Sequence, residues 1–194
     1  MTFQSHSQAG QDRFAYEVCG RKTDGTFLDL GCGDPEAYNN TYGLEKIGWR
    51  GICVDRYADP KRQPARTSPC LVANAADAGL LRNMLAGVMP PLIDYLSLDC
   101  DENSFAVLAA LPLDDYGFGV ITIEHDRYLR GDDLAEQQRD LLTGRCHYAL
   151  ICKDVHWEGG AFEDWYVASA SQYYVNALRF ICEGKMGSDI VNRV

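Results

Sequence analysis

The chain has 194 residues, of which 46% are hydrophobic and 24% are charged, values that suit one compact domain spanning residues 1–194. Its formal net charge of -10 argues against nucleic acid as the main partner, because sequence-independent affinity for a phosphate backbone comes from clustered Lys and Arg. One short basic strip (Lys61, Arg62 and Arg66) departs from this balance, and we expect it to be a solvated loop.

Short apolar runs alternate with helix-forming stretches along the chain. Six runs predict buried strands, because they are apolar or β-branched and mostly end in an acidic or small polar residue: Thr26–Leu30, Gly51–Asp55, Cys70–Ala73, Ile93–Asp99, Val120–Glu124 and Tyr148–Cys152. The stretches between them predict helices at Asn40–Ile47, Ala78–Gly87, Glu102–Ala110 and Asp132–Leu142. Near the end, the pattern predicts an edge strand at Phe162–Ala168 and a closing helix at Ser171–Cys182.

This alternation predicts an α/β fold of the Rossmann-like type. Strands separated by helices form a mostly parallel central sheet with right-handed crossovers and helices on both faces. The eight cysteines lie in apolar runs without a CxxC pair, which indicates reduced, buried thiols and gives a zinc site little support. No run approaches the ~20 apolar residues of a membrane span, and the first residues lack a signal-peptide pattern. We therefore expect a cytoplasmic protein without a membrane partner.

A glycine-containing turn follows the first predicted strand. Gly31 and Gly33 permit a tight turn in which the backbone comes close to a ligand. Asp55 ends the second strand, near the ~20-residue spacing at which an acid hydrogen-bonds a ribose. Ligands of open α/β sheets bind beyond the carboxyl ends of the strands. The pattern therefore predicts a nucleoside-containing cofactor.

The charges around this turn discriminate between two cofactors. A dinucleotide needs a third glycine where this chain has Glu36, and the carboxylates of Asp29 and Asp34 would repel a diphosphate. S-adenosylmethionine carries an ammonium and a sulfonium, which these carboxylates favour. The turn therefore predicts S-adenosylmethionine and disfavours an NAD-dependent oxidoreductase.

Five segments together resemble the FkbM family of class I methyltransferases. They are Ser7-Gln8-Ala9-Gly10-Gln11-Asp12-Arg13-Phe14, Phe27-Leu28-Asp29-Leu30-Gly31-Cys32-Gly33-Asp34-Pro35, Asn39-Asn40-Thr41-Tyr42-Gly43-Leu44-Glu45, Gly48-Trp49-Arg50-Gly51-Ile52-Cys53-Val54-Asp55 and Asp94-Tyr95-Leu96-Ser97-Leu98-Asp99. The resemblance runs from about Ser7 to Val167. It implies methyl transfer from S-adenosylmethionine, usually to a hydroxyl oxygen of a sugar or natural product.

The resemblance also implies roles for individual residues. By this resemblance, Asp29, Gly31 and Gly33 hold the methionine part of the cofactor, and Asp55 holds the ribose. Asn74 or Asp77 lies by the adenine, and Gln8 and Gln11 close over the cofactor. The chain departs from the family after the fourth strand, where many members have Asp-Val-Glu-Gly and this chain has Asp99-Cys100-Asp101-Glu102-Asn103. The departure concerns the acceptor pocket more than the cofactor.

Polar residues at the tips of the fourth and fifth strands are the catalytic candidates. Asp99 should lie near Glu124, His125 and Asp126, because these two strands are neighbours in this topology. We expect Asp154, which follows the sixth strand, to approach the same residues. Two mechanisms stay open. Asp99, Glu124 and Asp126 hold Mg²⁺ or Mn²⁺, which lowers the pKa of the acceptor hydroxyl, as in the catechol-type O-methyltransferases that this arrangement resembles. Alternatively, His125 acts as general base. Asp101 and Asp126 are also candidate helix caps.

The sequence thus predicts an S-adenosylmethionine-dependent methyltransferase that modifies a hydroxyl of a small molecule or glycan. The alternative is a catalytically silent S-adenosylmethionine-binding module that serves a partner protein. The acceptor, the metal and the oligomeric state, including whether a homodimer forms, stay open at this point.

Overall fold

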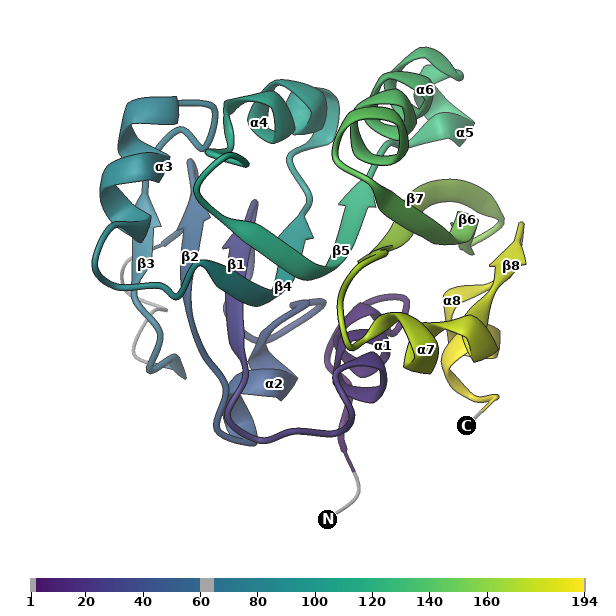
Figure 1. The fold of residues 1–194 in the computed structure, drawn as a ribbon, viewed down its shortest axis with the longest axis horizontal. Coiled ribbons are helices and arrows are strands. Elements are labelled where there is room, and N and C mark those ends of the chain that lie inside the picture. Colours follow the sequence, from purple (N-terminus) through teal and green to yellow (C-terminus); the bar gives the residue numbers. More distant parts are fainter. Residues whose placement is uncertain (1–2, 60–64, 194) are drawn as a thin grey trace.

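The computed structural model describes residues 3–59 and 65–193. Within them, eight strands form one sheet in the order β3-β2-β1-β4-β5-β7-β6-β8 (Figure 1). Strand β7 runs antiparallel to both of its neighbours, and the other pairings are parallel. The strands are β1 (Thr26–Leu30), β2 (Arg50–Asp55), β3 (Cys70–Val72), β4 (Leu92–Leu98), β5 (Gly117–Glu124), β6 (Tyr148–Trp157), β7 (Gly160–Ala168) and β8 (Cys182–Glu183).

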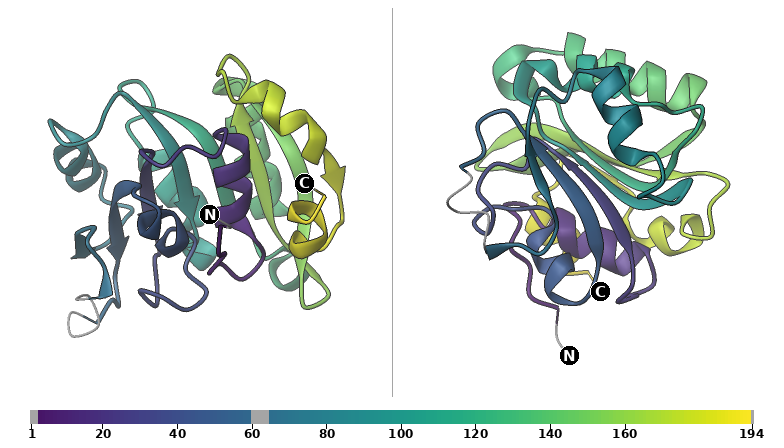
Figure 2. Two further views of the ribbon diagram at one scale, coloured as in Figure 1. Left: turned by 90° about the horizontal axis from the view of Figure 1, so that it is seen from below. Right: turned by 90° about the vertical axis from the view of Figure 1, so that its left-hand side faces the viewer.

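Helices cover the sheet on both sides (Figures 1 and 2). One layer holds α1 (Gln11–Val18), α2 (Tyr42–Lys46), α7 (Tyr174–Ala177) and α8 (Gly187–Val191). The other holds α3 (Ala78–Leu85), α4 (Ser104–Ala110), α5 (Arg127–Arg130) and α6 (Asp133–Arg139), the last continued by the π-helical segment η3 (Asp140–Arg145). Single 3-10 turns, η2 (Asp101–Asn103) and η4 (Leu178–Phe180), precede α4 and follow α7. No helix in the described part of the chain is both long and apolar enough to cross a membrane.

The alternation of side chains along β1 divides the core into two layers. Leu28 and Leu30 pack into the apolar cluster that holds α3 and α4, whereas Phe27 belongs to the cluster around α1. Successive residues of a strand point to opposite faces, so Asp29 shares the α1 and α2 face with Phe27. The remaining residues of β1 after Thr26 are all buried, as expected for an inner parallel strand covered by helices.

The α/β architecture predicted from the sequence is confirmed, with differences at the C-terminal end. The strand predicted at Phe162–Ala168 is present, but its predicted position at the edge of the sheet is wrong, because β7 lies between β5 and β6. The predicted strand Tyr148–Cys152 is only the first half of β6, which continues to Trp157 by pairing with β7. The predicted closing helix Ser171–Cys182 is broken: α7 and η4 are short, and Cys182 begins β8.

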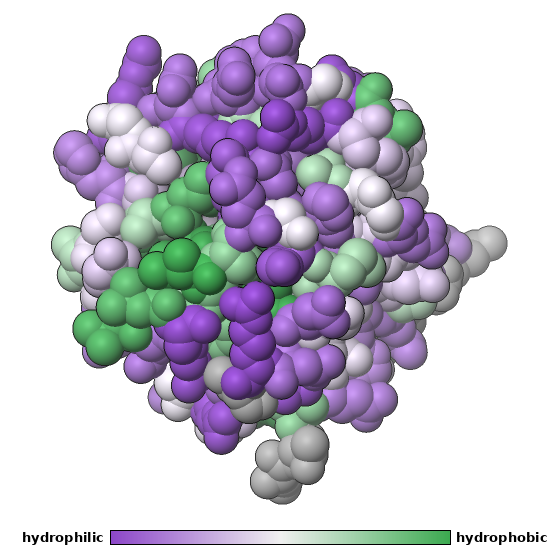
Figure 3. Space-filling view, turned by 90° about the vertical axis from the view of Figure 1, so that its right-hand side faces the viewer, coloured by the Kyte–Doolittle hydropathy of each residue, from purple (hydrophilic) through white to green (hydrophobic). Residues whose placement is uncertain are grey.

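Apolar side chains remain exposed along the C-terminal edge of the sheet, where the two-residue strand β8 lies outermost. Val175 is 74% exposed, Leu178 43% and Ile181 57%. Figure 3 views this side of the molecule and shows hydrophobic residues (green) gathered beside hydrophilic ones (purple).

Candidate cofactor and acceptor site

A cavity of about 180 Å³ opens at the carboxyl ends of β1, β2, β3 and β4. Four of its lining residues, Gly31, Asp55, Asn74 and Asp99, are site residues predicted from the sequence. Ligand pockets usually measure about 300–1,000 Å³, so this cavity suits one part of a cofactor, such as a nucleoside. The rest of the lining comes from the ends of β2 and β3 and from η2 and α4: Val54, Arg56, Tyr57, Ala73, Ala75, Cys100, Asp101, Glu102, Asn103 and Val107.

Gly31 turns the chain out of β1 and packs directly against the end of β4. Its φ of +83° lies in the left-handed region, and a Cβ atom there would stand 1.7 Å from the backbone oxygen of Asp99. Gly33 also has a positive φ, +53°, but a Cβ on it would meet nothing within 4 Å. Gly31 is therefore required by packing, whereas Gly33 faces open space.

Asp55 is held in place at the end of β2 by two backbone amides. The Gly33 amide donates to Oδ2 at 2.9 Å, and the Tyr57 amide donates to Oδ1 at 2.6 Å. The carboxylate therefore links the glycine turn to the cavity wall. An acid fixed in this way at the tip of the second strand is placed to accept hydrogen bonds from the hydroxyls of a ribose.

Asp29 is fully buried and lies outside the cavity lining. Its Oδ2 accepts a 2.6 Å hydrogen bond from the hydroxyl of Thr41, and Ser97 also bonds to it. Burial raises its pKa, and the nearby Arg66 acts against that rise. Of these two predicted cofactor residues, Asp55 therefore lines the cavity and Asp29 does not.

Arg66 is buried, which contradicts the solvated loop predicted for the basic strip; Lys61 and Arg62 lie outside the described residues. Its guanidinium donates to the Pro35 carbonyl at 3.3 Å, to Asn39 at 3.0 Å and to Thr41 at 3.0 Å, and it pairs with Glu45 at 3.2 Å. The arginine thus fastens the segment between β1 and α2. This role could not be predicted from the local sequence, because the four partners lie 21 to 31 positions earlier in the chain.

Asn40, the first residue of the helix predicted at Asn40–Ile47, is a buried polar residue that lies just before α2. Its Nδ2 donates to the Ser97 hydroxyl at 3.1 Å, and Ser97 in turn bonds to Asp29. The Oδ1 atom is buried without a hydrogen-bond partner. A buried acceptor left unpaired costs free energy, so this atom is a candidate acceptor for a donor group of a ligand.

The tips of β4 and β5 bring acidic side chains together, as predicted. Asp99 and Glu124 hydrogen-bond to each other. Burial, followed by the charges of neighbouring carboxylates, raises the pKa of Asp99 to about 6 and raises that of Glu124 as well. One oxygen each of Asp101, Glu124 and Asp126 lies within 4.8 Å of the others. The pair Asp99–Glu124 therefore retains a proton more readily than isolated carboxyls do.

Two of these acids have backbone conformations that are unusual for a side chain with a Cβ. Asp101 has a φ of +50° and Asp126 a φ of +48°, and neither side chain caps the following helix. Asp126 therefore takes the N-cap position of α5 without a side-chain hydrogen bond, whereas Asp101 is the N-cap of neither η2 nor α4. Left-handed non-glycine residues cost about 1–3 kcal/mol and concentrate at functional sites. Asp101 joins the cluster in the place that the sequence analysis gave to Asp99.

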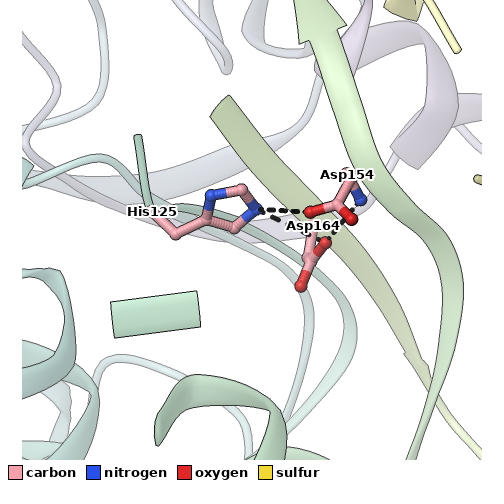
Figure 4. Close-up of side chains that lie close together, drawn as sticks. All are labelled: His125, Asp154 and Asp164. Carbon is pink, nitrogen blue, oxygen red and sulfur yellow. Dashed lines mark hydrogen bonds and ion pairs between the residues drawn. The ribbon is translucent and has the colours of Figure 1, made fainter. Parts of the chain in front are cut away.

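His125 follows β5 but is fully buried and does not line the cavity. Its Nδ1 accepts the backbone amide of Arg127 at 3.1 Å. Its Nε2 lies 3.5 Å from an oxygen of Asp164 and 3.8 Å from one of Asp154 (Figure 4). The same two carboxylates bind Arg139 at 2.7 Å each. This arrangement is a buried ionic network behind the acidic cluster.

The other predicted cofactor residues lie away from the cavity lining. Asp77 caps α3, because its side chain accepts the Leu80 amide at 3.0 Å. Gln11 is buried and accepts the Ala9 amide at 2.9 Å. Gln8 is only partly exposed and does not line the cavity either. Of the two alternatives for the adenine, Asn74 lines the cavity.

Comparison with solved structures identifies the fold. A protein classed as an O-methyltransferase from Klebsiella pneumoniae matches with a TM-score of 0.57 at 12% identity, covering 86% of this chain and 83% of that one. An O-methyltransferase from Bacillus cereus, solved in complex with SAH, matches with a TM-score of 0.56 at 15% identity over 85% and 84% of the two chains. The chain has the class I methyltransferase fold. A protein classed as an rRNA methylase from Clostridium thermocellum shares it, with a TM-score of 0.51 at 14% identity over 86% and 97%.

No family model matches the chain, and no curated protein matches it either. The resemblance to the FkbM family therefore stays a prediction from the sequence motifs.

Proposed function

We propose that the protein is an S-adenosylmethionine-dependent methyltransferase that O-methylates a hydroxyl group of a small molecule or sugar. The observation that carries the proposal is the cavity at the carboxyl edge of the methyltransferase-fold sheet, with Asp55 fixed on its wall and four carboxylates beside it. Its size suits the nucleoside of the cofactor, and its acidic surroundings favour a cation over a diphosphate.

The cofactor proposal is supported by the residues on either side of the glycine turn. Asp55 and Asn74 both line the cavity. In this proposal, Asp55 binds the ribose and Asn74 lies by the adenine. The unpaired Oδ1 of Asn40 and the buried carboxylate of Asp29 favour the methionine ammonium. When bound, S-adenosylmethionine supplies an electrophilic methyl group on its sulfonium. The B. cereus methyltransferase of the same fold was solved with SAH, which supports this choice of ligand.

For the acceptor side, we assign proton removal to the Asp99–Glu124 pair. Asp99 of this pair lines the cavity, whereas an acceptor would have to reach a fully buried imidazole to use His125. A carboxylate whose pKa is raised toward neutrality is the stronger base. Exposed aromatic rings stand at the same edge of the sheet and suit stacking on a sugar or phenol: Tyr38 is 71% exposed, Tyr57 85% and Tyr128 54%.

A divalent metal fits the same cluster. Oxygen ligands from Asp101, Glu124 and Asp126, with Asp99 adjacent, are what Mg²⁺ and Mn²⁺ prefer. Such an ion would lower the pKa of the acceptor hydroxyl. Arg130 competes for this position, since its guanidinium lies 3.5 Å from Asp126 and 3.9 Å from Asp101.

The test combines a binding and a turnover measurement. Isothermal titration with S-adenosylhomocysteine should show binding, and Asp55→Asn should raise its Kd at least about tenfold, the effect of losing one charged hydrogen bond. Asp24→Asn, an exposed acid outside the cavity lining, is the matched control. Asp99→Asn should retain binding but lose methyl transfer in a screen of phenols and sugars with and without Mg²⁺.

Each outcome separates the candidate functions. Absence of S-adenosylhomocysteine binding by the wild type, or stabilisation by NAD alone, refutes the proposed activity. Binding without turnover of any acceptor supports the silent binding module instead.

A further inference from the structure

Three cysteines gather on one face of the sheet, at the edge where the glycine turn leaves β1. Cys32 lies between Gly31 and Gly33, and its Sγ is 3.6 Å from the Sγ of Cys70 on β3. Cys53 on β2, the register partner of Cys70, also bonds to the Cys32 thiol. All three thiols are free. A chemical change at this cluster therefore acts directly on the turn that borders the cavity.

The thiols of this cluster differ in accessibility and in acidity. Cys53 is 1% exposed and Cys32 8%, whereas Cys70 is partly exposed. The hydrogen bond with Cys32 lowers the pKa of Cys70, while the Cys32 thiol keeps its proton. The nucleophile in disulfide exchange is the thiolate. Cys70 is therefore the thiol that meets an oxidant first, with Cys32 in contact to complete the reaction.

We propose that Cys32 and Cys70 form a reversible disulfide by exchange with a low-molecular-weight disulfide. The Cys70 thiolate attacks one sulfur of that molecule and releases its other half as a thiolate, leaving a mixed disulfide on Cys70. Cys32 then loses its proton to the released thiolate and attacks Sγ of Cys70, and the second small thiol departs. Two protein thiols are oxidised to one disulfide while one small disulfide is reduced to two thiols.

Closing this bond must disturb the turn. A disulfide needs an S–S distance of about 2.05 Å, so the two sulfurs have to approach by about 1.5 Å from their present 3.6 Å. Gly31 cannot follow freely, because it packs against the backbone of Asp99 and its amide donates to Val54 at 2.8 Å. The Gly33 amide in turn positions Asp55. Oxidation therefore weakens binding in the cavity, a consequence that rests on the proposed cofactor site.

The experiment incubates the full-length protein in mixtures of reduced and oxidised glutathione and maps its disulfides by peptide mass spectrometry. We expect a Cys32–Cys70 peptide pair that dithiothreitol removes. The Kd for S-adenosylhomocysteine should rise at least about tenfold on oxidation, since displacements of about 1 Å in a site have effects of this order or larger. Mapping depends on no cofactor, so it tests the disulfide even if the reduced protein fails to bind S-adenosylhomocysteine, a result that would refute only the proposed function.

Two variants locate the effect. Cys70→Ser should bind like the reduced wild type and lose the response to oxidation. Cys182→Ser removes a close thiol pair away from the turn, Cys152 and Cys182 on β6 and β8, and should keep the response. A cross-link of Cys32 to Cys53, no cross-link at all, or a response that survives in Cys70→Ser would overturn the proposal. So would a Cys32–Cys70 disulfide that leaves the Kd of a binding-competent protein unchanged.

Discussion

The two glycines of the turn offer a matched pair of substitutions with different expected costs. In Gly31→Ala, the new Cβ would lie 1.7 Å from the Asp99 oxygen and 2.6 Å from its carbon. Ordinary contacts are about 3.5 Å, so the ends of β1 and β4 would have to separate. The hydrogen bond from the Asp99 amide to the Leu30 carbonyl, at 2.9 Å, opposes this separation. In Gly33→Ala, the Cβ meets nothing within 4 Å.

The magnitudes follow from these contacts. A left-handed backbone costs alanine about 1–2 kcal/mol at either position. At Gly31, overpacking against backbone adds about 1–3 kcal/mol. We therefore expect the free energy of unfolding to fall by about 2–5 kcal/mol in Gly31→Ala and by about 1–2 kcal/mol in Gly33→Ala. The larger loss is a substantial fraction of the ~5–15 kcal/mol that stabilises most domains.

Urea unfolding of both variants and the wild type, analysed by linear extrapolation, measures the difference. Circular dichroism of each variant before unfolding shows whether it is folded at the start. Equal losses in the two variants, or a larger loss in Gly33→Ala, would refute the packing argument. Because Gly33 borders open space, its variant also reports on ligand contact: a change in S-adenosylhomocysteine affinity larger than its change in stability would place ligand atoms beside the turn.

Three further predictions concern buried carboxyls. Burial raises the pKa of Asp99 from 3.8 to about 6. The free energy of unfolding of the wild type should therefore fall as pH rises from 4 through 6, by at most about 3 kcal/mol. Urea unfolding at pH 4.5 and 7 should show a smaller change between the two pH values in Asp99→Asn. Burial also raises the pKa of Glu163, so Glu163→Gln should raise the Tm at pH 8 more than at pH 5, and an equal change at both would contradict the assignment. Burial acts to raise the pKa of Asp164, but opposing interactions, including the hydrogen bonds from Arg139, lower it to about 2. The stabilisation from Asp164 is therefore lost as pH falls from 3.8 through 2. At pH 7, Asp164→Asn should cost about 3–5 kcal/mol by urea unfolding, whereas Asp132→Asn, at an exposed partner of Arg127, should cost under about 1 kcal/mol.

The local sequence predicts the parallel half of the fold well, because buried parallel strands are continuous apolar runs. Strand β1 has the predicted bounds Thr26–Leu30, and β2 to β5 begin and end within three residues of the predicted ones. The C-terminal part is predicted less well. The place of β7 depends on pairing with β5 and β6, and the register shifts between β6 and β7 leave no periodic pattern in the sequence.

The candidate site divides in the same way. Gly31, Asp55 and Asn74 follow strand ends and could be located from strand positions alone. The surroundings of Asp29 could not be predicted, because its partners Thr41, just before α2, and Ser97, in β4, lie far from it in the sequence. His125 looked accessible from its place after β5, but β7 covers it, as the Phe162 carbonyl accepts its amide at 2.7 Å. Helix α1 was not predicted, because its N-cap residue is Gly10, which has no side chain to give a capping signal in the sequence.

The buried contacts of Arg66 make the β1–α2–β2 unit dependent on a residue that follows it. A fragment ending at residue 59 would contain the glycine turn and Asp55, yet it would lack the guanidinium that fastens Pro35, Asn39 and Thr41. The unit is therefore not an autonomous module that can be grafted onto another sheet. During synthesis on the ribosome, its final geometry has to wait until Arg66 has emerged and β3 has docked.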